Sequence, residues 1–306
     1  MKKVSVAGLA VGRLCLGSGF MLHGDQEEDC YRLLDAFVEG GGTMVDTGRV
    51  YGDAEAIIGR YLKKTHAPLQ VLTKGAHFDP RDPATPRVTP EAIAADSRIS
   101  LDLLGRPFDL YMLHRDHPAV SVGPLMEALN ALGPAGICTR YGVSNWSTAR
   151  IAQANAYAHA QGLTPLCASQ VLYSYARHND VPPTFQDCTH FEPGDDAFYL
   201  EQRMTTFAYS SQAGGYFDKL ATGRPVSDEL TRIYGGDVNA RRLEALRVMA
   251  DRHGAPVGAV ALSFLLNQPH PVVAIVGCHT LEQLQMSLAA ERLELSCEEQ
   301  ATLAAL

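Results

Sequence analysis

Short runs of apolar residues recur eight times along this chain, and segments with helical periodicity lie in most of the intervals between them. The eight runs are Leu14–Gly17, Thr43–Asp46, Val71–Lys74, Phe108–His114, Arg140–Ser144, Leu166–Val171, Thr205–Ser210 and Val272–Gly277. A strand followed by a helix, repeated eight times, is the pattern of a closed parallel (β/α)8 barrel, or TIM barrel. We therefore predict the α/β class and a single barrel domain over residues 1–306.

Seven segments between these runs are predicted to be helices. They are Glu27–Glu39, Ala54–Leu62, Pro90–Leu104, Val122–Leu132, Ser147–Gln161, Ala240–His253 and Val257–Asn267. The third has Thr89 as its N-cap, a proline at its first position and a stop at Gly105. The interval from Leu172 to Met204 is rich in Pro, Asp and His, so we expect a loop with at most one helix near the barrel mouth.

A doubly wound parallel sheet is the main structural alternative. Such a sheet usually carries a glycine-rich dinucleotide loop, G-x-G-x-x-G, directly after its first strand. The first run here continues as Gly17-Ser18-Gly19-Phe20, which is not that motif. The barrel is therefore the favoured prediction.

Composition and charge disfavour several classes of partner. A formal net charge of −8 argues against nucleic acid or an anionic membrane, because those surfaces are bound by clustered Lys and Arg. No apolar segment approaches the ~20 residues that a membrane helix requires. The seven cysteines are odd in number and never spaced C-x-x-C, so we expect reduced thiols and a cytoplasmic protein.

The first residues, Met1-Lys2-Lys3 followed by Val4–Val11, superficially resemble a secretion signal. Gly8 and Gly12 interrupt the short apolar run, and no A-x-A cleavage site follows it. We expect a short N-terminal hairpin in this place.

Three of the predicted strands end in residues with acid–base chemistry. They end at Asp46, Lys74 and His114, and Tyr51 lies in the loop after the first of them. The carboxyl ends of barrel strands meet at one mouth, so these side chains are expected to lie together. A free phenol titrates near pH ~10, and a neighbouring cation lowers that value. Lys74 can be the cation, with Asp46 balancing its charge and His114 orienting a substrate oxygen.

One segment resembles the signature of the aldo-keto reductases: Asp46-Thr47-Gly48-Arg49-Val50-Tyr51-Gly52-Asp53-Ala54-Glu55. The resemblance continues in order through Leu72-Thr73-Lys74, Asp109-Leu110-Tyr111-Met112-Leu113-His114, Tyr141-Gly142-Val143-Ser144-Asn145, Ala168-Ser169-Gln170 and Phe207-Ala208-Tyr209-Ser210-Ser211. These six motifs cover nearly the whole chain. The resemblance implies hydride transfer between NADPH or NADH and a carbonyl or alcohol, on a barrel without a Rossmann loop.

The resemblance also implies a role for each matching residue. Tyr51 would be the acid, Lys74 and Asp46 its tuning pair, and His114 the group that places the carbonyl. The nicotinamide would be held by Ser144, Asn145 and Gln170, with its ring stacked on Tyr209. The pyrophosphate would lie against the small residues Ser210, Ser211, Gly214 and Gly215. The sequence assigns no role to Arg49 or Trp146, which border these motifs.

At the adenosine end, the implied contacts follow the last strand and are Gly277, His279, Thr280, Gln283 and Ser287. Here the chain departs from the family pattern. Gln283 stands where many members have an arginine, and Ser287 replaces an asparagine often seen near the adenine. Without a permanently charged guanidinium, this end would hold the 2′-phosphate of NADPH less tightly. We expect a modest preference for NADP(H), with NAD(H) as the alternative.

Two other classes of function stay open at this point. A metal-dependent barrel hydrolase would draw ligands from His77, Asp79, His114, Asp116 and His117, although no H-x-H pair ends a strand and Lys74 brings a competing charge. The second class is a nucleotide-bound regulatory protein with slow or no turnover. The loops at the mouth are rich in His, Arg and Asp, which favours a small polar carbonyl compound, such as a sugar-like one, as substrate.

Overall fold

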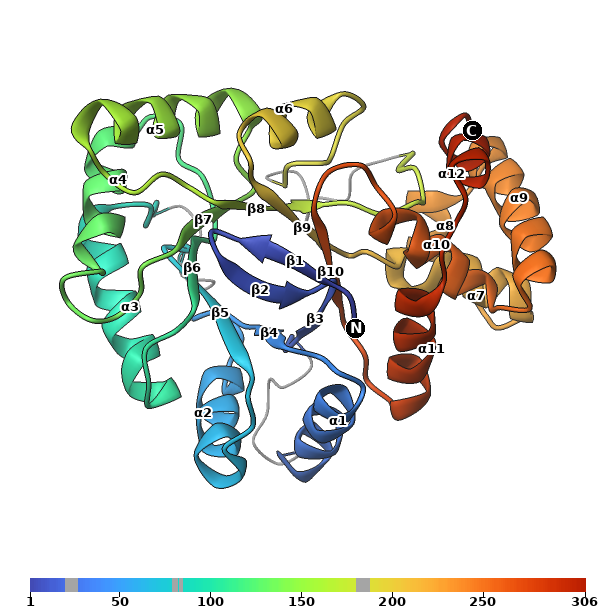
Figure 1. Cartoon of the computed structure of the whole chain (residues 1–306), viewed down its shortest axis with the longest axis horizontal. Helices are drawn as coiled ribbons and strands as arrows, with labels where there is room; N and C mark the ends of the chain where they lie inside the picture. The colour runs from blue at the N-terminus through green and yellow to red at the C-terminus, as the bar shows by residue number, and fades with distance from the viewer. Residues whose placement is uncertain (20–26, 79–81, 83–84, 180–187) are drawn as a thin grey trace.

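A computed structural model describes residues 1–19, 27–78, 82, 85–179 and 188–306. Eight parallel strands close into a barrel in the order β10-β3-β4-β5-β6-β7-β8-β9, and helices surround it (Figure 1). The strands are β3 (Leu14–Gly17), β4 (Met44–Asp46), β5 (Gln70–Gly75), β6 (Leu110–Leu113), β7 (Tyr141–Ser144), β8 (Ala168–Leu172), β9 (Thr205–Tyr209) and β10 (Val272–Val276). The prediction of a TIM barrel is confirmed.

The barrel strands are apolar along their length because helices cover one face and the barrel interior takes the other. The longer helices of the outer layer are α1 (Glu27–Glu39), α2 (Ala54–Thr65), α3 (Pro90–Leu104), α4 (Val122–Ala131), α5 (Thr148–Gln161), α9 (Asp237–His253), α10 (Val257–Leu266) and α11 (Leu281–Arg292). In α3 the Thr89 side chain accepts from the Ala92 amide, and Gly105 ends the helix at φ 68°, as its sequence predicts.

Several short helices carry too little periodicity to be recognised in the sequence. They are α6 (Asp195–Glu201), α7 (Tyr216–Thr222), α8 (Asp228–Tyr234) and α12 (Cys297–Ala304). In the described part of the interval Leu172 to Met204, α6 is the one helix, as expected. Among the described residues, no helix is both long and apolar enough to span a membrane.

The chain begins with the expected hairpin, in which β1 (Lys3–Val6) pairs antiparallel with β2 (Leu9–Gly12). This hairpin lies across the end of the barrel that faces the viewer in Figure 1. Its Val6 and Val11 are buried in one cluster with interior residues of the barrel, including Met44 and Leu72. The hairpin therefore closes the amino end of the barrel and leaves the carboxyl end for a ligand.

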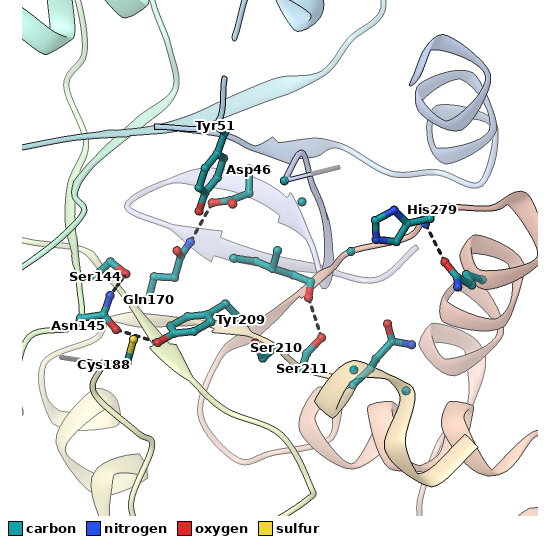
Figure 2. Close-up of a pocket in the computed structure, with 18 of the residues that line it drawn as sticks. Asp46, Tyr51, Ser144, Asn145, Gln170, Cys188, Tyr209, Ser210, Ser211 and His279 are labelled. Carbon is teal, nitrogen blue, oxygen red and sulfur yellow. Dashed lines mark hydrogen bonds between the residues drawn. The ribbon is translucent and has the colours of Figure 1, made fainter. Parts of the chain in front are cut away.

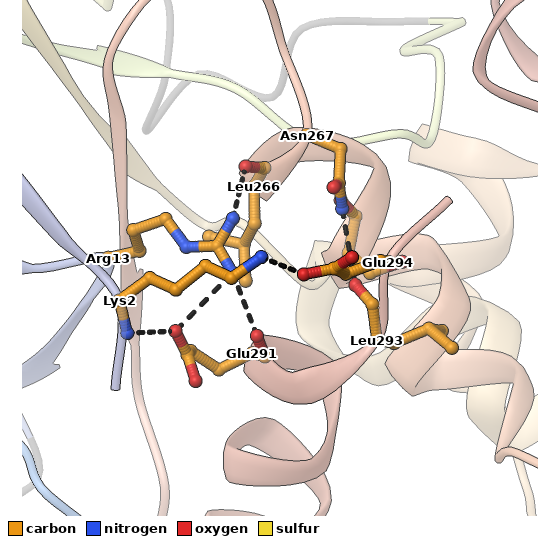
Figure 3. A network of polar contacts seen from close by, with 8 residues as sticks. Lys2, Arg13, Leu266, Asn267, Glu291, Leu293 and Glu294 are labelled. Atoms are coloured by element: carbon orange, nitrogen blue, oxygen red, sulfur yellow. Dashed lines mark hydrogen bonds and ion pairs between the residues drawn. The ribbon is translucent and has the colours of Figure 1, made fainter. Parts of the chain in front are cut away.

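A polar network ties the seam between β3 and β10 to the C-terminal helices (Figure 3). The buried guanidinium of Arg13 donates to the Leu266 carbonyl at 2.9 Å and to the Glu291 carbonyl at 2.8 Å. The backbone nitrogen of Lys2 donates to Glu291 Oε1 at 2.5 Å, and the Lys2 side chain pairs with Glu294. Residues far apart in the sequence thus hold the barrel closed.

Candidate active site

Four side chains meet at the carboxyl end of the barrel. Asp46 ends β4, Lys74 lies near the end of β5, His114 directly follows β6, and Tyr51 extends from the loop between β4 and α2. Lys74 Nζ is 2.5 Å from Asp46 Oδ1 and 5.0 Å from the centre of the Tyr51 ring. The His114 ring meets that of Tyr51 edge-on, with 5.5 Å between ring centres. The structure thus brings together the four residues that the sequence placed at one mouth.

Lys74 is a fully buried cation whose charge is balanced locally. Its ammonium donates to Asp46 Oδ1 and also to the Thr47 carbonyl at 2.8 Å. Burial alone would lower the pKa of Lys74, but the neighbouring Asp46 carboxylate and Tyr51 phenol raise that pKa above its ordinary value. The ammonium therefore stays charged beside the phenol.

The pKa of Tyr51 differs from the sequence expectation. Burial raises this pKa, and the neighbouring Lys74 acts against the shift without outweighing it. The neighbouring cation can be expected from the sequence. The size of the opposing effect, desolvation of the Tyr51 hydroxyl, depends on burial in the fold. The result is a phenol that keeps its proton at neutral pH, next to a cation that favours the phenolate once the proton leaves.

His114 is held as a neutral imidazole. Burial lowers its pKa well below the ordinary value, and the charges of Lys74, His77 and Arg115 lower it further. Its Nδ1 is buried and has no hydrogen-bond partner among the described residues. Because Nδ1 has no accessible surface, a small polar ligand in the cavity would meet the neutral ring through its other nitrogen, Nε2.

Asn145 organises the next part of the wall (Figure 2). It follows β7 in the left-handed conformation, at φ 63°. Its Nδ2 donates to the Ser144 hydroxyl at 3.1 Å and the His114 carbonyl at 3.3 Å, while its Oδ1 accepts from the Tyr209 hydroxyl at 2.9 Å and the Thr189 amide at 3.2 Å. Both amide donors and both lone pairs are used within the protein. Asn145 therefore acts through Ser144 and Tyr209, whose own positions it fixes.

Gln170 links this wall to the buried ion pair. Its Nε2 donates to Asp46 Oδ1 at 2.9 Å (Figure 2), and the same carboxylate oxygen also accepts from Lys74. The side-chain carbonyl oxygen of Gln170 can still accept a hydrogen bond, and the Ser144 hydroxyl can still donate one. A carboxamide has one donor and one acceptor side, so it can bind to both groups.

A tight turn after β9 forms the middle of the cavity wall. Four of its residues have positive φ: Ser210 at 50°, Ala213 at 50°, Gly214 at 64° and Gly215 at 76°. A Cβ on Gly214 would lie 3.0 Å from the Leu230 side chain, so the turn favours glycine for both its conformation and its space. Concave backbone of this kind is a common cradle for phosphate groups.

At the far end, the cavity wall includes Gly277, His279 and Gln283 but neither Thr280 nor Ser287. The prediction that Thr280 and Ser287 face a ligand is not supported by their surroundings. The Thr280 hydroxyl accepts from the Gln283 amide at 3.2 Å as the N-cap of α11. The buried Ser287 hydroxyl donates to the Gln283 carbonyl at 2.9 Å. Both hydroxyls thus make local hydrogen bonds within their helix, and Ser287 Oγ also accepts from Nε2 of the cavity-wall residue Gln212 at 3.3 Å.

These parts line one continuous cavity of about 750 Å³, which runs from Tyr51 and His114 to Gln283 and Met286. Six polar side chains on its wall were not predicted from the sequence: Arg115, Cys188, Gln212, Asp218, Lys219 and Arg224. Arg115 directly follows His114, and Lys219 comes one helical turn after Gly215, so proximity to a motif was the available signal. Arg224 pairs with Asp218.

The other residues considered from the sequence form ion pairs or hydrogen bonds within the protein. Arg49 pairs with the buried Glu55 at 2.8 Å, and the buried Trp146 donates to the Arg115 carbonyl at 3.1 Å. Of the metal-ligand candidates, Asp116 pairs with Arg150 at 2.8 Å, and Asp79 lies outside the described residues. Within the described ranges, no three His, Cys, Asp or Glu residues are grouped to hold a metal ion.

Fold and site together define a class: a parallel (β/α)8 barrel with acid–base side chains at its carboxyl end. Within that class the chain belongs to the aldo/keto reductase family, whose model matches residues 13–306. The family resemblance seen in the sequence motifs is thereby confirmed.

Individual relatives are distant in sequence. Norsolorinic acid reductase of Emericella nidulans is 25% identical, with 96% of this chain and 78% of the relative covered. An uncharacterized oxidoreductase of Mycobacterium tuberculosis is 30% identical over 84% of this chain and 75% of its own. An aldo/keto reductase of Klebsiella pneumoniae, solved with NADP and acetate, shares the fold at a TM-score of 0.72 and 23% identity, covering 100% of this chain and 95% of its own.

Proposed function

We propose that this protein reduces the carbonyl group of a small polar aldehyde or ketone to an alcohol, with NADP(H) as cofactor and Tyr51 as proton donor. The observation that carries the proposal is the position of Tyr51. Its phenol lies beside the buried Lys74–Asp46 pair and the neutral His114, at one end of a cavity whose other parts have the features of a dinucleotide site.

The residues on the cavity wall fit such a cofactor. Ser144 and Gln170 offer a hydroxyl hydrogen and a carbonyl oxygen for the carboxamide, and Tyr209 offers an aromatic ring beside them. The left-handed turn at Gly214 and Gly215 offers a cradle for phosphates. When bound, a reduced nicotinamide supplies the hydride of the reaction.

The protein's own groups manage the proton. Tyr51 is protonated at neutral pH because burial raises its pKa, so its hydroxyl can give a proton to the carbonyl oxygen as negative charge develops there. The Lys74 ammonium then stabilises the phenolate that remains, and Asp46 keeps the ammonium charged. His114, neutral and on the cavity wall, orients the substrate oxygen toward the phenol.

The preference for NADP(H) rests on positive charge on the cavity wall. Lys219 lies on that wall beside the left-handed turn and supplies a cation that Gln283 does not, whereas the Arg224 guanidinium is paired with Asp218. The Klebsiella pneumoniae relative was solved with NADP, which agrees with this preference. Michaelis constants for NADPH and NADH, measured with one aldehyde, test it. A lower constant for NADH would contradict it.

Replacement of Tyr51 by Phe tests the proton donor. The ring, its contact with His114 and the cavity are retained, while the hydroxyl is removed. We expect turnover to fall at least ~100-fold, as is typical when a positioned acid is lost, with NADPH binding nearly unchanged. The measurements are NADPH oxidation followed by absorbance, and cofactor binding followed by fluorescence. A variant that retains most of its activity would show that another group donates the proton.

A further inference from the structure

Arg115 is a cation at the carbonyl end of the cavity that no carboxylate of the described residues neutralises. It directly follows His114 and lines the cavity wall. Its Nε lies 3.3 Å from His77 Nε2, its Nη1 lies 3.3 Å from Cys188 Sγ, and its guanidinium carbon is 5.9 Å from the centre of the Phe78 ring. All three partners are uncharged in their ordinary states at neutral pH.

Other arginines in this region have acidic partners. Arg49 pairs with Glu55, Arg87 with Asp96 and Arg150 with Asp116, each at 2.8 Å. The carboxylate at this end of the cavity, Asp46, is already matched by Lys74. Among the described residues, Arg115 therefore leaves the carbonyl end with an excess positive charge.

That charge acts directly on the proposed reaction groups. Burial is the largest influence on their pKa values, raising those of Tyr51 and Tyr209 and lowering those of His77 and His114. The positive charge of Arg115 contributes a lowering of the pKa in each of these four side chains. The guanidinium is thus electrostatically coupled to the place where a substrate carbonyl would lie.

A chain of contacts also links the Arg115 side chain to the place where a substrate carbonyl would lie. Its Nε reaches His77, whose ring centre is 4.7 Å from that of His114, and the His114 ring touches Tyr51. A ligand whose oxygen meets Tyr51 and His114 therefore extends toward Arg115 with only a short linker.

We propose, resting on the proposed function, that the substrate is a carbonyl compound with a carboxylate a few bonds from its carbonyl carbon, and that Arg115 binds this carboxylate. A guanidinium presents paired N–H donors that match the two oxygens of a carboxylate. A single arginine balances one negative charge, which suits a carboxylate better than a phosphate dianion. Arg115 would then set specificity, while Tyr51 and His114 act on the carbonyl.

A matched pair of aldehydes tests the proposal: 4-carboxybenzaldehyde and its methyl ester, methyl 4-formylbenzoate. The two share the reacting carbonyl and differ in the charge. We expect kcat/KM for the acid to exceed that for the ester about tenfold or more, because charge-assisted hydrogen bonds discriminate on this scale. Arg115→Met should abolish this ratio by lowering the value for the acid, and Arg115→Lys should restore part of it.

The control is Arg247→Met, on the exposed face of α9, where Arg247 pairs with Glu244. It removes the same charge far from the cavity and should leave the acid-to-ester ratio unchanged. An equal ratio for the wild type and Arg115→Met would overturn the carboxylate site while leaving the reductase function intact.

Binding of benzoate and benzamide, measured by calorimetry without turnover, separates the two proposals. We expect the wild type to bind benzoate more tightly than benzamide and Arg115→Met to lose the difference. If neither aldehyde is reduced but this difference is found, the proposed reaction fails and the anion site stands. Equal binding of benzoate and benzamide by the wild type would overturn the anion site.

Discussion

At the scale of single residues, the feature with the highest desolvation cost is the fully buried ammonium of Lys74. Its charge is tolerated because Asp46 and the Thr47 carbonyl surround it within hydrogen-bond distance. Gln170 donates to the same oxygen of Asp46, so the carboxylate keeps one partner if Lys74 is removed. The pair is thus a structural element as well as part of the proposed proton-transfer site.

We predict that Lys74→Met lowers the rate of reduction at least ~100-fold. In the direction of alcohol oxidation, the pH at which activity appears should rise, because the phenol of Tyr51 loses the cation that lowers its pKa. The melting temperature should also fall, since Asp46 stays buried with its main ionic partner gone. Rates as a function of pH and thermal unfolding measure both effects.

Lys63→Met, on the exposed side of α2, provides the control for loss of a lysine. It should alter neither the pH profile nor the rate. A Lys74→Met variant with the wild-type pH profile would show that Lys74 does not tune the acid.

Individual site residues were predictable where a motif fixes their backbone position. Asp46, Tyr51, Lys74 and His114 occupy strand ends or the loop beyond one, which the alternating pattern of the sequence places together. The hydrogen bonds of Asn145 were not predictable, because they come from segments as distant as Thr189. Thr280 was assigned to the cofactor, yet it caps its own helix. Which of two competing partners a hydroxyl chooses depends on geometry that a sequence does not contain.

At the scale of elements, the sequence predicted every end of the barrel strands to within two residues and seven of the eight longer helices, whereas the bounds of α11 were not predicted. The predicted strand Phe108–His114 is shorter in the structure, where β6 is Leu110–Leu113. Helices of seven or eight residues, such as α7 and α12, escaped prediction because two turns give too few apolar positions for a periodicity. The residues α7 adds to the cavity wall were missed with it.

The position of Lys219 on helix α7 leads to a prediction about cofactor binding. Its Lys219 stretches back over the left-handed turn, with Cε 3.8 Å from the place of a Cβ on Gly215. We predict that Lys219→Met raises the Michaelis constant for NADPH about tenfold, with kcat nearly unchanged, because a phosphate loses a cation that it meets in both ground and transition states. Steady-state kinetics at saturating aldehyde measure this.

Lys219→Arg keeps the charge and should stay close to the wild type. Parallel measurements with NADH locate the phosphate: an equal rise for both cofactors indicates the pyrophosphate, and a rise for NADPH alone indicates the 2′-phosphate. Unchanged constants for both would show that Lys219 does not contact the cofactor.

At the scale of the whole molecule, buried neutral histidines make stability sensitive to acid. Burial lowers the pKa of His178 and of His270 to about 4. Both ring nitrogens of each are buried without a hydrogen-bond partner among the described residues. An unfolded histidine binds its proton near pH ~6.5, so between that pH and about 4 the unfolded chain holds more protons than the folded one. Stability is therefore complete above this window and is lost as pH falls through it.

We predict that the melting temperature falls markedly between pH 7 and pH 4.5, and that His270→Phe reduces this fall. The His270 ring stacks on Phe191 with 5.1 Å between ring centres, so phenylalanine preserves the packing while removing the titration. Thermal unfolding at the two pH values measures the effect. His159→Gln, at an exposed position of α5, is the matched control and should follow the wild type. An identical fall in His270→Phe would show that His270 does not contribute.

The seam tied by Arg13 and Glu291 has a consequence for how the chain is made. The two residues are 278 positions apart, and β3 can pair with its neighbour β10 only after the strands between them have been synthesised. Contacts of such long range form late and slow folding. Gly277, His279 and Gln283 on the cavity wall are synthesised long after Tyr51, Lys74 and His114. Completion of the cavity therefore waits for these residues, and a truncated product that contains Tyr51, Lys74 and His114 still lacks the proposed adenosine end.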